Sequence, residues 1–128
     1  EESLDPWKKN FFQDELSHNI AFFYVAEHIE QQVIIGYILF WIFEDTLELH
    51  DILVRGKYRR MGVGSELMKA MFQLAHIKKV KEIFLEVRKS NLEAIQFYKT
   101  FKFTKTGERA NYYKNPQEDA LVLGLLLF

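Results

Sequence analysis

Two glycines in a short basic segment are the first residues in this sequence whose type and spacing indicate binding chemistry. The segment Arg59 to Ser65 reads Arg-Arg-Met-Gly-Val-Gly-Ser, after an apolar run that ends at Val54. A helical pattern begins at Ser65. Glycines let the backbone turn closely around a ligand, and the free N–H groups at the start of a helix attract phosphate. The segment therefore predicts main-chain binding of a phosphorylated ligand.

The glycine spacing is also compatible with a turn that has no ligand. It matches neither the P-loop, which needs Gly-Lys-Ser/Thr after four intervening residues, nor the dinucleotide-binding pattern of three glycines. Many strand-to-helix connections contain two glycines for the turn alone. From this segment by itself, both interpretations stay open.

Three further side chains could take part in proton transfer. Glu86 lies inside the apolar run Ile83 to Val87, where it is either an acid on the exposed face of a strand or a partly desolvated general base. Tyr98 is either a core tyrosine whose hydroxyl finds a partner or a proton donor to a leaving group. Asn91 is most simply a helix N-cap, a role for which Ser90 competes.

The elements that must position these residues follow from hydrophobic periodicity. The expected order is a first helix that starts at Asp5-Pro6-Trp7, then three strands, a helix, a strand, a helix and two strands. The expected strands are Ile20 to Glu27, Val33 to Phe43, Thr46 to Val54, Ile83 to Val87, Phe101 to Tyr113 and Ala120 to Leu127, and the further helices are Ser65 to His76 and Asn91 to Thr100. Hairpins at both ends and crossovers between them predict a mixed α/β (α+β) fold. Its sheet is mostly antiparallel, with a central parallel strand pair and flanking helices.

Composition narrows the class of protein. With 128 residues, 48% hydrophobic and 16% aromatic, the chain suffices for one domain over residues 1–128 with a packed core. A net charge of -1 argues against direct nucleic-acid binding. The longest uncharged apolar run, Val33 to Phe43, is too short to cross a bilayer as a helix. We expect a cytoplasmic protein without a membrane partner, as a monomer or weak dimer.

Metal and thiol chemistry are not expected. The sequence contains no cysteine, which excludes thiolate ligands and a cysteine nucleophile. None of the histidines (His18, His28, His50 and His76) pairs with another ligand at metal-binding spacing, so we interpret all four as structural or surface residues.

Taken together in this order, the motifs resemble the GNAT superfamily of acetyl-CoA-dependent N-acetyltransferases. The segments that carry the resemblance are Tyr58 to Gly64, Leu85 to Asn91, and Ala94 to Tyr98. Two later segments, Arg109 to Tyr113 and Glu118 to Ala120, are similar to the RimI type, which acetylates the N-terminal alanine of a small-subunit ribosomal protein. The resemblance spans nearly the whole chain. It implies acetyl-CoA as the donor and a protein or peptide N-terminus as the acceptor.

The resemblance also implies a role for each matching residue. Glu86 stands where the superfamily has its base, and Tyr98 where it has the acid that protonates the leaving thiolate. The pyrophosphate of CoA would bind at Arg59, Arg60, Met61, Gly62, Val63, Gly64 and Ser65, and its pantetheine arm at Ile52, Leu53 and Val54, with Asn91 fixing the region beside it. The peptide groove would be lined by Trp7, Tyr112, Tyr113 and Glu118.

Some features depart from the superfamily pattern. Lys79 and Lys102 stand where a glycine usually follows a helix, at an expected cost of about 1 kcal/mol each if the backbone keeps a positive φ. The superfamily's first strand would precede Glu1, so we expect a shortened start.

Two other functions remain open at this stage. An enzyme of the same fold could acetylate a small amine, a polyamine or a lysine side chain. Alternatively, the chain could be a non-catalytic acyl-CoA-binding module, although the presence of both Glu86 and Tyr98 argues against it.

Overall fold

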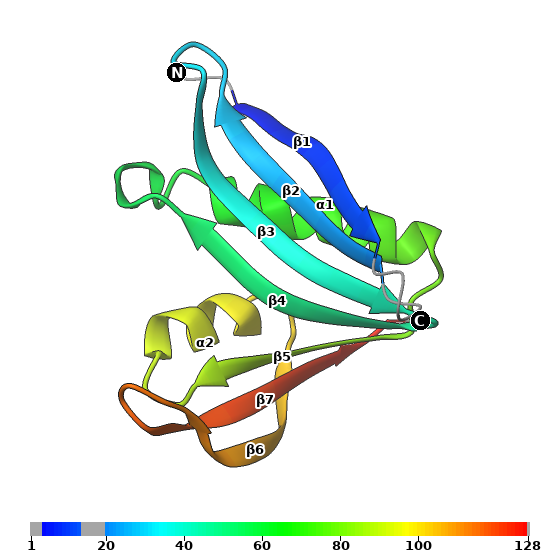
Figure 1. Ribbon diagram of the computed structural model, residues 1–128, viewed down its shortest axis with the longest axis vertical. Coiled ribbons are helices and arrows are strands. Elements are labelled where there is room, and N and C mark those ends of the chain that lie inside the picture. The colour runs from blue at the N-terminus through cyan, green and yellow to red at the C-terminus, as the bar shows by residue number, and fades with distance from the viewer. Residues whose placement is uncertain (1–3, 14–19, 128) are drawn as a thin grey trace. The chain divides into compact units, whose positions relative to one another are not determined.

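The computed structural model describes residues 4–13 and 20–127, which group into two units, residues 1–80 and 81–128 (Figure 1). Within its described residues, the first unit contains four strands, β1 (Leu4–Gln13), β2 (Ile20–His28), β3 (Val33–Phe43) and β4 (Thr46–Val54). Each strand pairs with the next in antiparallel fashion. A 3₁₀ turn, η1 (Gly56–Tyr58), then leads into helix α1 (Val63–Ile77).

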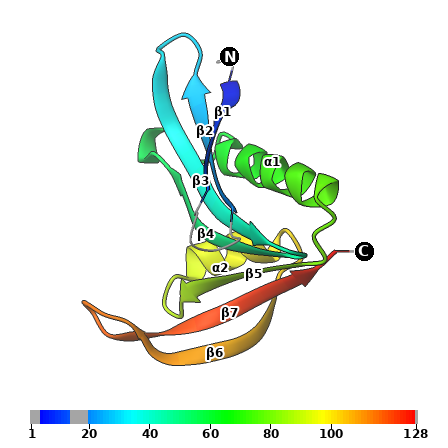
Figure 2. The same ribbon diagram turned by 45° about the vertical axis from the view of Figure 1, so that its right-hand side comes forward.

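Helix α1 packs on one face of the β1–β4 sheet, as both ribbon views show (Figure 2). Strand residues that alternate along β3 and β4 meet the apolar stripe of the helix, as expected for an amphipathic helix on a sheet. The buried side chains include Ile38, Phe40, Ile42, Leu47, Leu49, Leu67, Met68 and Met71. This core fixes the start of α1 against the sheet.

The second unit, described to residue 127, is a three-stranded antiparallel sheet with one helix. Its elements are β5 (Glu82–Arg88), α2 (Leu92–Lys99), β6 (Thr104–Tyr113) and β7 (Glu118–Leu126). Strand β7 pairs with β5 on one side and β6 on the other. Its buried side chains include Ile83, Leu85, Val87, Ile95, Tyr98, Phe103 and Leu123.

Most of the expected elements are confirmed. Strands β3 and β4 have the expected bounds, and α1 begins two residues before the expected Ser65. The closing hairpin forms as expected, with β6 starting at Thr104 rather than Phe101 and β7 at Glu118 rather than Ala120. Among the described residues, no helix is long and apolar enough to span a bilayer.

The expected first helix is wrong, because residues 4–13 form strand β1. Asp-Pro resembles a helix start, but proline is also tolerated in an edge strand or at a bulge, where no N–H is needed for the ladder. The pairing of β1 with β2 shifts register between Asp5 and Lys8, so Pro6 and Trp7 fall within that irregularity. The sequence signal alone could not separate these two uses of proline.

Three expectations about the chain's organisation stay predictions. The central parallel strand pair would join a strand of one unit to a strand of the other. The division into two units does not test the expectation of a single domain or that of a further strand before residue 1.

Both lysines that follow a helix have a left-handed backbone. The φ angle is 60° at Lys79, after α1, and 77° at Lys102, after α2. In this region the Cβ of an L-residue crowds the neighbouring backbone, which glycine avoids. The sequence therefore places a strained residue at each of these helix ends.

Replacing Lys102 by glycine is expected to raise the free energy of unfolding by about 0.5–1 kcal/mol, because the strain of the positive φ disappears. The matched control, Lys99→Gly inside the last turn of α2, should lower it by about 1 kcal/mol. Urea denaturation of both variants measures the difference. Equal losses in both would show that Lys102 is not strained.

Candidate active site

The connection from β4 to α1 has the features of a phosphate-binding loop. Gly62 is the N-cap of α1 with φ 82°, and no side chain caps the helix. The N–H groups of the first turn, which include those of Val63, Gly64 and Ser65, therefore lack partners within the helix. Arg59, Arg60 and Met61 are exposed beside them, so positive charge and free donors occur together.

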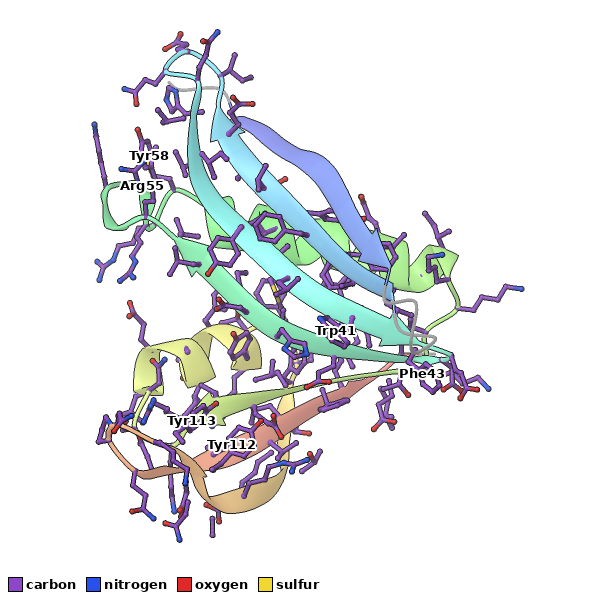
Figure 3. All side chains as sticks on the ribbon, viewed as in Figure 1. Trp41, Phe43, Arg55, Tyr58, Tyr112 and Tyr113 are labelled. Carbon is purple, nitrogen blue, oxygen red and sulfur yellow. The ribbon has the colours of Figure 1, made fainter. Side chains whose placement is uncertain are left out.

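The loop is attached to the sheet at several points. The backbone N–H of Arg55 donates to the Ile35 carbonyl at 2.8 Å, and Arg59 Nε donates to the Val54 carbonyl at 3.3 Å. Tyr58 is buried and its hydroxyl donates to Gln31 Oε1 at 2.5 Å, in the β2–β3 turn. Figure 3 shows Arg55 and Tyr58 together at this end of the first unit. The loop is thus preorganised by the sheet.

Gly36 of β3 is a positioning residue that the sequence analysis missed. A Cβ at this position would lie 2.9 Å from the Leu53 carbonyl oxygen and 3.3 Å from a Val63 methyl. Because glycine has no Cβ, the first turn of α1 can lie close to the paired strands β3 and β4. A glycine inside a strand is a known sign of close backbone approach, and this sign could have identified it.

Gly36→Ala is expected to lower the free energy of unfolding by about 1–3 kcal/mol, because the Leu53 backbone must shift to admit the methyl group. Gly56→Ala is the control, since a Cβ there would meet nothing within 4 Å. Thermal or urea unfolding of the two variants compares them. A Gly36→Ala protein as stable as the control would disprove the close packing.

The segment predicted to hold the pantetheine arm, Ile52 to Val54, follows a bulge in β4. Leu39 pairs with Asp51 but Phe40 pairs with Leu49, so His50 is the extra residue. Before the bulge the odd-numbered residues Leu47 and Leu49 are buried, whereas after it the odd-numbered Asp51 and Leu53 are exposed, Leu53 to 45%. The bulge therefore turns this segment's side chains relative to the first half of the strand.

The bulge also brings polar side chains onto the face of β3 and β4. The Tyr37 hydroxyl donates to Asp51 Oδ2 at 2.6 Å, and this hydrogen bond is the main cause that raises the pKa of Tyr37. His50 stacks on the Trp41 ring at 4.9 Å. This cluster could not be found from the sequence, because the register that assembles it depends on the bulge.

Glu86, the predicted base, lies on β5 opposite Val122 of β7. Its side chain is only 11% exposed and forms an ion pair with Nε of Arg109 on β6. The Arg109 guanidinium also lies 5.5 Å from the Tyr112 ring centre. The carboxylate is thus largely withdrawn from solvent, and its role as a base stays a prediction.

Asn91 and Tyr98 both have structural contacts in α2. The Asn91 side chain accepts a hydrogen bond from the Ala94 N–H at 3.2 Å, so it is the N-cap of the helix. Tyr98 is buried, with its ring near those of Phe97 and Phe103. Neither arrangement tests the roles that the resemblance implies for them.

Glu118 joins the β6–β7 hairpin to the end of β5. One carboxylate oxygen accepts from Arg88 at 3.2 Å and the other from the Ser90 backbone N–H at 2.6 Å. Arg88 also donates to the Lys114 and Pro116 carbonyls, and its guanidinium lies 4.5 Å from the Tyr113 ring centre. Tyr112 and Tyr113 are next to each other with perpendicular rings (Figure 3). The Arg88–Glu118 clamp therefore contacts Tyr113, and Tyr112 packs against Tyr113.

The hydrogen bond from Ser90, followed by the contacts with Arg88, lowers the pKa of Glu118 from 4.5. A carboxylate with a lowered folded-state pKa adds stability above the unfolded pKa and loses it as the pH falls through the folded pKa. Glu118→Gln should therefore lower the free energy of unfolding at pH 7, and the difference from the original protein should shrink below about pH 4.5.

Urea denaturation between pH 7 and pH 3 measures this dependence. Glu82→Gln, which removes an exposed carboxylate from β5, is the control for the change in net charge. A deficit of Glu118→Gln that stays constant with pH would show that the clamp is not electrostatic.

The histidines of the described residues occupy unlike environments. His28 is fully buried beside Tyr58, with Nδ1 accepting from the Gln31 N–H at 3.1 Å. His50 and His76 are exposed. His18, like the side chain of Trp7, lies outside what the structure describes.

Residues 1–103 match the acetyltransferase (GNAT) family. The chain belongs to this family. GNAT enzymes use acetyl-CoA, so the protein is an acyltransferase with acetyl-CoA as the donor. The phosphate-binding features of the β4–α1 loop agree with that donor.

Similar proteins match over most of the chain. A Bacillus subtilis (strain 168) protein, provisionally named a [ribosomal protein bS18]-alanine N-acetyltransferase, is 34% identical over 92% of this chain and 78% of its own length. An N-alpha-acetyltransferase of Sulfurisphaera tokodaii is 32% identical over 88% of this chain and 74% of its own.

Solved GNAT structures confirm the mixed α/β fold. Ard1 from Thermoplasma volcanium has a TM-score of 0.77 and 31% identity, covering 83% of this chain and 70% of its own. The Escherichia coli ribosomal-protein-S18-alanine N-acetyltransferase has a TM-score of 0.73 and 27% identity, covering 89% and 71%. Arabidopsis thaliana Naa50, in complex with the bisubstrate analogue CoA-Ac-MVNAL, has a TM-score of 0.74 and 26% identity, covering 82% and 72%.

Proposed function

We propose that this GNAT enzyme transfers acetyl from acetyl-CoA to the N-terminal α-amine of a polypeptide, with a ribosomal protein as the acceptor. The observation that carries the proposal is Glu86, a carboxylate mostly withdrawn from solvent beside the tyrosine pair of β6. The names of the relatives, which specify ribosomal-protein alanine or N-alpha acetylation, support this choice of acceptor.

The β4–α1 loop would hold the donor by its pyrophosphate. Backbone N–H groups after Gly62 supply directed hydrogen bonds, and the helix dipole favours the negative charge. Arg59 and Arg60 are exposed and available to add charge. Ile52, Leu53 and Val54 would bind the pantetheine arm through their main chain, and the role of Asn91 in cofactor binding stays a prediction.

The acid–base chemistry would be carried by Glu86 and Tyr98. Glu86 accepts a proton from the acceptor's ammonium, directly or through a water molecule. Acetyl-CoA supplies the acetyl group as a thioester, whose carbonyl carbon the freed amine attacks. Tyr98 donates its phenolic proton to the sulfur as the carbon–sulfur bond breaks. The second proton lost by the attacking nitrogen returns the phenolate of Tyr98 to its neutral form, and the proton on Glu86 returns to solvent. The products are then an amide and CoA.

A peptide α-amine suits a base of this kind. Its pKa is about 7.7–8.0, against about 10.4 for a lysine side chain. At neutral pH a modest base can therefore generate the free amine, and positioning then supplies much of the rate. This difference favours an N-terminus over a lysine side chain as the acceptor.

The β6–β7 hairpin would form one wall of the peptide groove. Tyr112 is 44% exposed and Tyr113 is half-buried, so both rings offer surface to an extended chain. Both carboxylate oxygens of Glu118 are already hydrogen-bonded, so it contributes by holding the hairpin turn. Trp7, whose side chain is not described, stays a predicted part of the other wall.

The acceptor class can be tested by incubating the enzyme and acetyl-CoA with a panel of synthetic peptides and small amines. Peptides that begin with alanine should gain one acetyl group at the N-terminus, found by fragmentation mass spectrometry. N-terminally blocked peptides that contain lysine are the control. Acetylation of only spermidine, free lysine or the blocked peptides would disprove the proposed acceptor.

Glu86→Gln and Tyr98→Phe are each expected to lower turnover by about 10²–10⁴-fold, because each removes one proton-transfer group. The affinity for acetyl-CoA, measured by calorimetry, should change little. Phe97→Leu, at the neighbouring half-buried ring, is the control for packing in α2. Turnover within a few-fold of the original in both variants would remove this acid–base pair.

A further inference from the structure

We propose that Arg109 is a positioning residue that covers Glu86 until an acceptor arrives, and that the acceptor's ammonium takes its place. The inference rests on the proposed function, in which Glu86 receives a proton from that ammonium. It assigns a role to the ion pair between β5 and β6 and predicts how the enzyme selects a charged acceptor.

The sheet of the second unit dictates that the two side chains meet. Glu86 lies opposite Val122 of β7, and Arg109 lies opposite Ala120, two residues away on the same strand. Side chains at these positions point to one face of the sheet. Gly107, which also lies opposite Val122, has no side chain that could intervene. The pair therefore spans the width of β7.

The other charged groups near Glu86 have their own partners. Arg88, on the same strand, donates to Glu118 and to the carbonyls of Lys114 and Pro116. Lys89 and Lys105 both pair with Glu108. Among the residues that the structure describes, Arg109 is thus the cation that pairs with Glu86.

The two members of the pair differ in their freedom to move. The Glu86 side chain is 11% exposed, whereas the Arg109 side chain is 57% exposed. A largely buried carboxylate without a positive partner is costly, but a guanidinium on an exposed stem can return to water cheaply. Exchange of one cation for another keeps the carboxylate compensated throughout, and Arg109 is the member that leaves.

The neighbouring tyrosine gives the displaced arginine a resting surface. The Arg109 guanidinium already lies 5.5 Å from the centre of the Tyr112 ring, which is 44% exposed. A cation over an aromatic face is stabilised even without its carboxylate. Arg109 can therefore release Glu86 without losing every contact.

This exchange makes the positive charge of the acceptor the source of selectivity. An acceptor with an ammonium compensates Glu86 after Arg109 leaves, whereas an uncharged analogue cannot. Removing Arg109 removes the competitor, so it should strengthen the binding of charged acceptors only. Turnover at saturation should be preserved, because Arg109 has already left Glu86 in the reacting complex.

The test compares two synthetic peptides that differ only in the N-terminal amine. One begins with alanine, and in the other a propanoyl group replaces that alanine. Calorimetry measures their affinity for the enzyme saturated with CoA, so that no reaction occurs. Arg109→Gln should bind the alanine peptide about two- to fivefold more tightly and the propanoyl peptide unchanged. Arg109→Met, which keeps an apolar stem over Tyr112, should behave alike.

Two controls separate charge from exchange. Lys105→Gln removes the same charge from β6 but does not touch Glu86, and both affinities should stay unchanged. Arg109→Lys keeps a competing cation and should restore the original affinities. In steady-state assays with acetyl-CoA, Arg109→Gln should lower KM for the alanine peptide and keep kcat within about twofold of the original.

The results distinguish a failure of the proposed exchange from a failure of the proposed function. If the original enzyme acetylates alanine peptides but Arg109→Gln shifts both affinities equally, or weakens the alanine peptide, the exchange is disproved and the proposed function stands. If the original enzyme neither binds nor acetylates the alanine peptide, the proposed function fails and the exchange fails with it.

Discussion

A carboxylate that is largely withdrawn from water requires a positive partner, and this requirement organises the second unit. Arg109 is the positive partner of Glu86. The two residues lie on β6 and β5, the two strands that pair with β7, and their side chains meet across β7. Two residues along β5, Arg88 presents the opposite charge to Glu118 and to the hairpin carbonyls. The sheet thus carries two ion pairs between different strands, and the more exposed member of the Glu86–Arg109 pair is the arginine. Arg88 lies over the Tyr113 ring, and Arg109 pairs with Glu86 and lies near the Tyr112 ring.

In the first unit, the main feature is the start of α1, where the backbone N–H donors have no side-chain cap. Helix α1 begins without a side-chain cap, at a glycine with positive φ. Its first turn stays in place because Gly36 lets Val63 approach the sheet and because Tyr58 joins η1 to the β2–β3 turn. Close packing therefore replaces the stability that a cap would contribute. The N–H groups at the start of α1 therefore have no side-chain cap, as the proposed phosphate site requires.

The amino-acid pattern was sufficient for most elements and for the family. Alternation of apolar residues defined β3 and β4, and the 3.6-residue period defined α1, because these segments bury one face each. It failed at Pro6, where the same residue suits a helix start and an irregular edge strand. It also passed over Gly36, whose effect depends on a helix that follows it by 27 residues in the sequence.

The sequence by itself determined which reactive groups are available: a glycine loop that suits a phosphate, a carboxylate and a phenol that are proposed for proton transfer, and no thiol. These groups follow from the residue types and their order. Local hydrophobic periodicity then predicts which strand or helix carries each of them. Only the tertiary structure decided which side chains neutralise one another. The Glu86–Arg109 and Arg88–Glu118 pairs join residues 23 and 30 positions apart, and strand register determines such contacts. Register depends on the whole sheet, because a slip of one residue would turn each side chain to the other face.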